Sequence, residues 1–290
     1  MVKTKTVSDQ DEYWDLEIKP KKNWFDVDLS EVWKYRDLMW LFVRRDFVAQ
    51  YKQTILGPLW HLIQPVLTTI MFLMIFGRIA RIPTDGINPI LFYMSGITFW
   101  NYFATCLTNT SNTFVTNVAI FGKVYFPRII IPLSVVISNM VRFGIQFLLL
   151  LGAMIWFNFH GEPIVLTVNW LVLPFLIVLM ASIGLGLGII ISSLTTKYRD
   201  FAVLLTFAVQ LGMYATPIAY PMSFLKGKSY GWLIEANPLS AIVEVYRYAL
   251  FGKGTFEMSD VLYSVIFMAV TLILGFLIFN RVEKTFMDTV

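Results

Sequence analysis

Six long apolar runs are the feature of this 290-residue sequence that most restricts how it can fold. Each has at least the roughly 20 residues that a helix needs to cross the hydrocarbon core of a bilayer. Because lipid-exposed backbone must satisfy its own hydrogen bonds, we expect a helix in every run. The sequence therefore predicts an all-α integral membrane protein with six transmembrane helices, at residues 59–79, 89–115, 129–159, 168–194, 201–220 and 261–280.

The composition supports this class. Hydrophobic residues make up 57% of the chain and charged residues only 14%, whereas soluble domains are about 25% charged. The single cysteine, Cys106, excludes an intrachain disulfide. The first 30 residues contain no short apolar run of the kind found in cleavable signal peptides, so the first span is expected to serve as its own insertion signal.

The placement of positive charge predicts the orientation. If the N-terminus is cytoplasmic, 16 of the 23 Lys and Arg residues fall on the cytoplasmic side, including those in both short loops on that side. Cytoplasmic loops of membrane proteins carry such an excess. Both termini are therefore expected in the cytoplasm.

The segment before the first span predicts a surface helix. Ser30 can cap a helix over residues 31–50. Apolar side chains recur there at helical spacing, at Val32, Tyr35, Met39, Val43 and Phe47. We expect an amphipathic helix at the membrane interface, held to the anionic inner surface by Arg44, Arg45 and Lys52; the alternative is a helix packed on the protein itself.

Polar side chains form stripes within three predicted spans. Such groups are costly in a membrane and usually face a bundle interior or a wet path. The stripes contain Asn101, Thr105, Thr108 and Asn112 in the second span, Ser134, Ser138, Arg142 and Gln146 in the third, and Thr206, Gln210 and Tyr214 in the fifth. Without carboxylate partners they favour a neutral, hydroxyl-rich substrate over a proton relay or cation site. The alternative is hydrogen bonding between packed helices. The sixth span has almost no polar residue and is expected to face lipid.

The second and fourth predicted spans also contain an aromatic cluster and a glycine motif. An aromatic cluster near the outer end of the second span contains Phe99, Trp100, Tyr102 and Phe103. In the fourth span, Gly184 and Gly188 form a GxxxG motif with Gly186 between them, which predicts close helix packing.

A short helix is predicted between the fifth and sixth spans. Asn237 is its N-cap, Pro238 its first residue and Gly252 its stop. Glu244 and Arg247 are three residues apart and can pair. We expect a re-entrant or surface helix near the outer exit, with an ordinary outer loop helix as the alternative.

Signals of catalysis are missing. The sequence has no GxxxxGK[ST] phosphate-binding loop. His61 and His160 have no metal ligands at suitable spacing. The "DVD" of residues 26–28 matches a short motif of sugar-nucleotide transferases, but the tail leaves no room for their nucleotide-binding domain. We predict no catalytic residue, no metal site, no cofactor and no nucleic-acid partner in this chain.

Four blocks of the sequence resemble the ABC-2-type permeases that export polysaccharides such as O-antigen, capsule and teichoic acid. They occur in that family's order and cover nearly the whole chain from about Leu29: RRDFVAQYKQTILGPLWHLIQP at 44–65, FGKVYFPRIIIPLS at 121–134, TTKYRDFAVLLTFAVQLGMYATPIAYP at 195–221 and NPLSAIVEVYRYALFG at 237–252.

The resemblance implies a half-transporter of a bacterial inner membrane. Two copies of this permease would work with two copies of a separate ATPase that binds ATP and Mg. A coupling segment would be seated on that ATPase: Phe121, Gly122, Lys123, Val124, Tyr125, Phe126, Pro127 and Arg128. The resemblance also places a periplasmic gate at Asn237, Pro238, Glu244 and Arg247. The implied divisions are a polar tail at 1–29, an interface helix and linker at 30–58, and a transmembrane domain at 59–290.

The expected substrate is a lipid-linked polysaccharide that enters from the cytoplasmic leaflet. Its path is predicted along Trp60, Phe99, Trp100, Asn101, Tyr102, Thr105, Thr108, Asn112, Arg142, Gln210 and Tyr214. ATP binding in the partner would move the coupling segments and shift the two permease copies about spans one and five. The alternatives are an ABC-2 exporter of a smaller lipid or drug, and a membrane-bound glycosyltransferase or acyltransferase.

Overall fold

The computed structural model describes residues 29–52, 55–121, 123–124, 126–161, 168–196, 198, 200–225, 227–229, 231–254 and 257–289. These residues form helices and turns and contain no strand, which confirms the all-α class. The predictions for the polar tail before Leu29, and for Gly122 and Tyr125, lie outside the described residues.

Five of the described helical segments are long and apolar enough to cross a membrane: Trp60–Ile79, Pro89–Ser111, Ile130–Phe159, Val168–Thr195 and Met258–Val282. They agree with five of the six predicted spans. The first consists of α3 (Trp60–Phe72) and a π-helical segment η2 (Leu73–Ile79), preceded by a 3-10 turn η1 (Gly57–Leu59). The others are α4 (Pro89–Ser111), α7 (Ile130–Phe159), η3 (Val168–Val172) with α8 (Leu173–Thr195), and α12 (Met258–Thr289).

The fifth predicted span is shorter than expected. α9 (Asp200–Tyr214) has only 15 residues, whereas the apolar run continues to residue 220. Pro217 explains the early end, because it disfavours helical backbone at the preceding residue. Turns follow α9 at 215–218.

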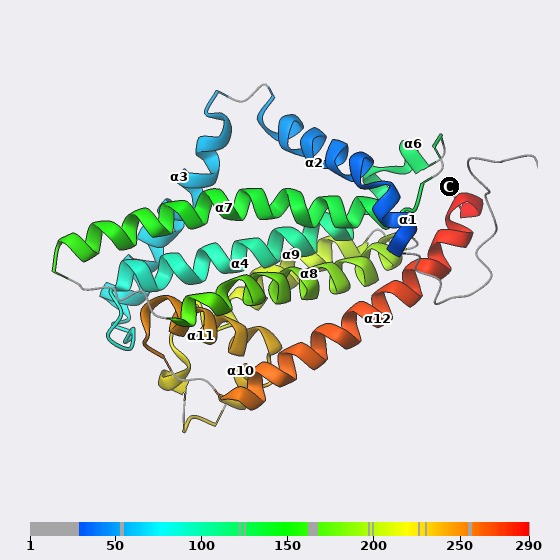
Figure 1. The fold of residues 1–290 in the computed structure, drawn as a ribbon. Helices are drawn as coiled ribbons and strands as arrows, with labels where there is room; N and C mark the ends of the chain where they lie inside the picture. Colours follow the sequence, from blue (N-terminus) through cyan, green and yellow to red (C-terminus); the bar gives the residue numbers. More distant parts are fainter. Residues whose placement is uncertain are drawn as a thin grey trace, which may run out of the picture.

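The predicted surface helix is two helices. α1 (Leu29–Lys34) and α2 (Arg36–Tyr51) meet at Tyr35, whose φ of −94° and ψ of 18° interrupt the helix. The predicted cap is wrong, because Ser30 lies inside α1. α2 lies against α7 (Figure 1) and buries Phe42 and Val43, while Trp40 on its other side is exposed. It is thus packed on the protein through one face and open on another.

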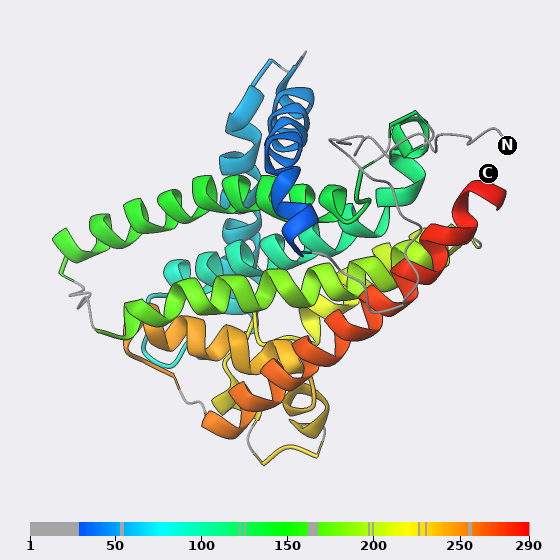
Figure 2. The ribbon, with the colours of Figure 1, turned by 45° about the vertical axis from the view of Figure 1, so that its right-hand side comes forward.

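α4 is the centre of the bundle. It packs against α3, α7, α8, α9 and α11. α12 packs against the side of α8 that faces away from α4 (Figure 2). α1 and the last turns of α12 lie at one end of the bundle, which we call the terminal end; α10 and the loop at 80–88 lie at the other, which we call the loop end (Figure 1). Two short helices, α5 (Thr113–Thr116) and α6 (Val118–Phe121), follow α4 at the terminal end.

The glycines of α8 pack as predicted. A Cβ on Gly184 or Gly188 would lie 3.0 Å or 2.6 Å from the nearest side-chain atom of α4. Gly186 faces the opposite way, and a Cβ there would lie 2.9 Å from the backbone carbon of Thr271 in α12. α12 therefore does not face lipid all round, because the side that carries Thr271 is buried against α8.

The loop end contains η4 (Met222–Leu225), α10 (Gly231–Glu235) and α11 (Pro238–Phe251). The predicted start and stop of α11 are confirmed. Asn237 accepts a hydrogen bond from the Leu239 backbone N–H at 3.0 Å, and Gly252 ends the helix with φ at +66°. Most side chains of α11 are buried, so this helix is packed into the bundle rather than lying on its surface.

Candidate functional site

A polar cavity of about 420 Å³ lies between α2, α4 and α7, toward the terminal end. Nine of its twelve lining residues are polar or charged. The twelve come from α2 (Arg45, Asp46, Ala49), from α4, α5, α6 and the residues between them (Asn109, Asn112, Thr116, Asn117, Ile120) and from α7 (Val135, Ser138, Asn139, Arg142). A membrane protein contains few such polar spaces, and they mark the paths and sites of its ligands.

Asn139 organises the inner wall of the cavity. Its side chain is only 1% exposed. Its Oδ1 accepts hydrogen bonds from Asn109 Nδ2 and from Arg142 Nη1, each at 3.1 Å. One amide oxygen therefore joins α4 to α7 and orients the arginine.

Arg45 forms the opposite wall. It pairs with Asp46 at 2.8 Å, and its Nη2 donates to Asn117 Oδ1 at 3.3 Å. Its guanidinium lies 4.7 Å from the centre of the Phe42 ring. These contacts tie α2 to the turns after α4.

The cavity unites four residues that the sequence singled out for separate reasons: Arg45 as an interface residue, Asn112 and Arg142 as path residues, and Ser138 as a member of the polar stripe in the third span. Sequence reasoning missed Asn109, Asn117 and Asn139. A signal for Asn139 was present, since it is a further polar residue of the third span, three residues before Arg142 and hence on the same helix face.

Several predicted path residues instead satisfy their own helix. The Thr105 hydroxyl donates to the Asn101 carbonyl at 2.8 Å, and the Thr108 hydroxyl donates to the Ala104 carbonyl at 2.7 Å. Asn112 Nδ2 in turn donates to the Thr108 carbonyl at 3.0 Å. The stripe in α4 is therefore mostly bonded internally, and only Asn112 of these residues lines the cavity.

The predicted aromatic path along α4 lies in the core. Phe99, Trp100 and Tyr102 are at most 3% exposed. Phe99 stacks on Tyr246 of α11 with ring centres 4.1 Å apart. In this conformation these rings hold helices together and have no surface for a substrate.

Three other residues of the predicted substrate path are exposed at the surface of the chain. Trp60 on α3 is 52% exposed and Tyr214 on α9 is 51% exposed, and Gln210 on α9 is exposed as well. They lie on exposed faces of α3 and α9 that also carry exposed apolar side chains, with Gln64 and Thr206 as further exposed polar residues.

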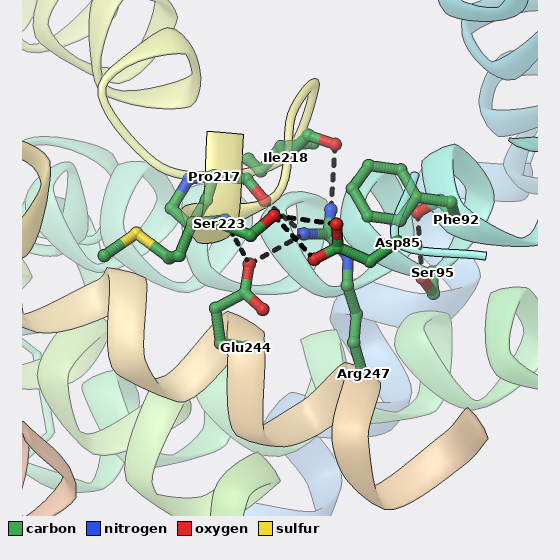
Figure 3. A network of polar contacts seen from close by, with 9 residues as sticks. Asp85, Phe92, Ser95, Pro217, Ile218, Ser223, Glu244 and Arg247 are labelled. Carbon is green, nitrogen blue, oxygen red and sulfur yellow. Dashed lines mark hydrogen bonds and ion pairs between the residues drawn. The ribbon is translucent and has the colours of Figure 1, made fainter. Parts of the chain in front are cut away.

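A second polar network occupies the loop end and includes two of the predicted gate residues (Figure 3). Arg247 is 1% exposed and pairs with Glu244 at 3.4 Å, as predicted. Its guanidinium donates to the carbonyls of Pro217 and Ile218, the latter at 2.8 Å, and lies 3.7 Å from the centre of the Phe92 ring. Arg247 thus joins α11, α4 and the turn after α9.

Glu244 extends the network toward the loop helices. Its Oε1 accepts a hydrogen bond from the Met222 backbone N–H at 3.1 Å. Nearby, the Ser223 hydroxyl donates to the Asp85 carboxylate at 2.7 Å (Figure 3). Burial raises the pKa of the Glu244 carboxyl, and the Arg247 cation opposes this rise. Burial lowers the pKa of Arg247 to about 10, so its guanidinium stays charged at neutral pH.

The other two predicted gate residues, Asn237 and Pro238, lie at the start of α11 in the same region. Pro238 is the first residue of α11. Asn237 Nδ2 donates to the Ala215 carbonyl and to the Thr216 hydroxyl, both at 2.9 Å. The N-cap of α11 is therefore also an attachment point for the chain after α9.

The predicted coupling segment has a buried base and an exposed tip. Phe121, Phe126 and Pro127 are buried, and the rings of Phe121 and Phe126 stack 6.0 Å apart. Arg128 lies 5.5 Å from the Phe121 ring centre. Lys123 and Val124 are exposed at the terminal end.

The three predicted interface residues differ in their surroundings. Arg44 and Lys52 are exposed, whereas Arg45 faces the cavity. No group of three His, Cys, Asp or Glu residues that could hold a metal occurs in the part of the chain that the structure describes.

The chain is similar over most of its length to known transport proteins. A family model described as "ABC-2 type transporter" matches residues 37–251. The O-antigen export system permease protein RfbA of Klebsiella pneumoniae is 30% identical over 255 residues, which cover 87% of this chain and 94% of that protein. The protein of the same name from Myxococcus xanthus is 26% identical over 222 residues, 76% of this chain and 82% of that protein. The polysialic acid transport protein KpsM of Escherichia coli is 22% identical over 250 residues, 84% of this chain and 93% of that protein.

Proposed function

Because the chain belongs to the ABC-2 type transporter family, we propose that it is the transmembrane subunit of an exporter of lipid-linked polysaccharide. The observation that carries this proposal is the similarity to an O-antigen export permease, which is 30% identical over 87% of this chain. The chain has no phosphate-binding loop in its sequence, so the energy would come from a separate ATPase subunit that binds ATP and Mg. The chain itself is a transport subunit and not an enzyme.

The ATPase would be seated at the terminal end. The exposed Lys123 and Val124 support this assignment, because they project from a base held by buried aromatic rings. Residues 121–128 would then transmit ATP-driven movement to α4 and α7. The stoichiometry that we propose is two permease and two ATPase subunits.

The proposed topology has six crossings, with α9 and the turns after it forming the fifth. The position of α1 and the last turns of α12 at the same end of the bundle supports this even number (Figure 1). The positive-inside pattern then assigns that end to the cytoplasm and the loop end to the outer face of a bacterial inner membrane. Residues 59–290 would be the transmembrane domain, and residues 30–58 the interface helices and linker.

A second copy of the chain would complete the path. α3 and α9 each expose large apolar side chains, including Leu67, Met71, Phe207 and Leu211. Lipid or another permease copy must cover them. We propose that the glycan passes between two copies along Trp60, Gln210 and Tyr214, because aromatic faces allow a sugar chain to slide. The network around Arg247 would hold the outer gate.

The test is export in cells. A strain that lacks this chain should lose surface polysaccharide and accumulate the lipid-linked glycan inside, and the wild-type gene should restore export. A catalytically inactive ATPase partner should produce the same defect. Unchanged surface polysaccharide in the deletion strain, together with altered efflux of a small lipid or drug, would refute the proposal.

A further inference from the structure

We propose that the cavity between α2, α4 and α7 binds the phosphate group of an anionic lipid headgroup. The cavity is distinct from the exposed faces of α3 and α9 along which the glycan is proposed to move. The inference rests on the proposed function only for the identity of the lipid, which would be the diphosphate carrier of the glycan.

The charges of the lining favour an anion. Two guanidinium groups, Arg45 and Arg142, face the cavity, and Asp46 is its one carboxylate. That carboxylate is already engaged by Arg45 at 2.8 Å. The lining therefore carries one net positive charge in a setting partly removed from water, where charge–charge attraction is stronger than in bulk water.

Most of the hydrogen-bonding groups that the lining offers are donors, which favours a phosphate over a sugar. A sugar hydroxyl donates as well as accepts, so it needs acceptors in its site. Asn139 Oδ1 already accepts two hydrogen bonds from the protein, and Asn117 Oδ1 accepts one from Arg45. A guanidinium group offers five donors and no acceptor. A group that only accepts, such as a phosphate, suits this lining better.

Ser138 supplies an independent observation. Its side chain lines the cavity and is 2% exposed, yet its hydroxyl has no hydrogen-bond partner among the described residues. A buried hydroxyl without a partner is unfavourable, so a ligand that accepts its hydrogen bond would be stabilised there. It lies one helical turn before Arg142, so both can donate to one ligand.

The cavity is open at its rim and large enough for a phosphate group. Arg142 follows the start of α7 at Ile130 by 12 residues, or about 18 Å along the helix axis. Asn109 and Thr116 are exposed at the cavity rim. Its volume of about 420 Å³ is far above the roughly 30 Å³ of one water molecule. A phosphate group can therefore enter the cavity through this rim.

The experiment measures lipid binding to the full-length chain, with any ATPase that co-purifies, in phosphatidylcholine nanodiscs. Radiolabelled polyprenyl diphosphate is titrated in, with empty nanodiscs as background, and competed with phosphatidylglycerol or with polyprenol that lacks phosphate. Arg142→Gln should weaken binding about tenfold or more, since a charged hydrogen bond contributes about 1.5–3 kcal/mol. Arg36→Gln is the matched control, because Arg36 lies on α2 outside the cavity lining; it should bind as wild type does.

A second variant covers the case in which Arg142→Gln fails to fold. Ser138→Asp would place a carboxylate beside Arg142. Its negative charge should repel the phosphate and weaken binding as much as Arg142→Gln does. Competition by phosphatidylglycerol would support the site and identify membrane phospholipid as a ligand. Resistance to it would support the site and identify the diphosphate carrier. Competition by polyprenol, or unchanged binding in both variants, would overturn the inference. If the two variants lose export in cells but still bind polyprenyl diphosphate, the proposed function stands and this site is refuted. The two proposals therefore fail separately.

Discussion

Replacing Arg247 by methionine should strongly destabilise the loop end of the molecule. The substitution leaves Glu244 as a buried carboxylate, 3% exposed, without its cation. It also removes the donors to the carbonyls of Pro217 and Ile218. Breaking a buried ion pair by removing one partner costs about 3–5 kcal/mol. We expect a loss of about 4 kcal/mol, and hence a fall in melting temperature of about 10 °C.

The assay is thermal unfolding in detergent, followed by fluorescence-detected size exclusion. Adding Glu244→Met to Arg247→Met should restore about 2 kcal/mol, because the double variant no longer buries an unpaired charge. Arg78→Met is the control: Arg78 is exposed at the same end of the molecule, and its loss should change stability by less than about 0.5 kcal/mol. Equal melting temperatures for Arg247→Met and the control, or additive losses in the double variant, would refute the reasoning.

A substitution on the facing helix tests the same contact sterically. A Cβ on Gly96 of α4 would lie 2.8 Å from Arg247 Nη2. Gly96→Ala should therefore displace the guanidinium and lower the melting temperature in the same direction. Gly152→Ala, where no atom lies within 4 Å of the added Cβ, should leave it unchanged or raise it slightly.

Three further substitutions give distinct readouts. Gly186→Ala should lower the free energy of unfolding by about 1–3 kcal/mol, because the added methyl group forces α8 away from Thr271 of α12. Gly144→Ala, with open space around it, should have no such effect. Equal unfolding temperatures for the two variants would contradict the close packing. Asn237→Ala should cost about 1 kcal/mol by removing a helix cap, and unaltered unfolding would show that this cap is dispensable. Tyr214→Ala should slow export of surface polysaccharide but leave the unfolding temperature unchanged, since its ring is exposed. Normal export by this variant would refute the proposed passage of the glycan along Tyr214.

The sequence predicts the spans well because a lipid-crossing helix needs only local information. α7 begins at Ile130 and ends at Phe159, within one residue of the expected run. Local capping rules also located α11 correctly through Asn237 and Gly252. The same rules failed at Ser30, where the helix begins one residue earlier and breaks at Tyr35 instead.

The sites were predicted less well because they depend on which helices meet. Thr105 and Thr108 share a polar stripe with Asn112, but their hydroxyls bond to their own helix backbone, which the pattern alone could not reveal. Phe99 was expected on a path and stacks in the core against Tyr246, 147 residues away in sequence. The cavity combines residues from α2, α4 and α7, so its composition follows only from the packing.

The central position of α4 gives the molecule a mechanical link between its two ends. This helix carries Gly96 under the Arg247 guanidinium and Asn109 in the wall of the polar cavity. Thirteen residues separate them, about 20 Å of continuous hydrogen-bonded helix. A helix packed on several sides cannot bend freely between these points, so it moves largely as a rigid rod. Any tilt of α4 at the cavity must therefore also displace the seat of Arg247 at the opposite end.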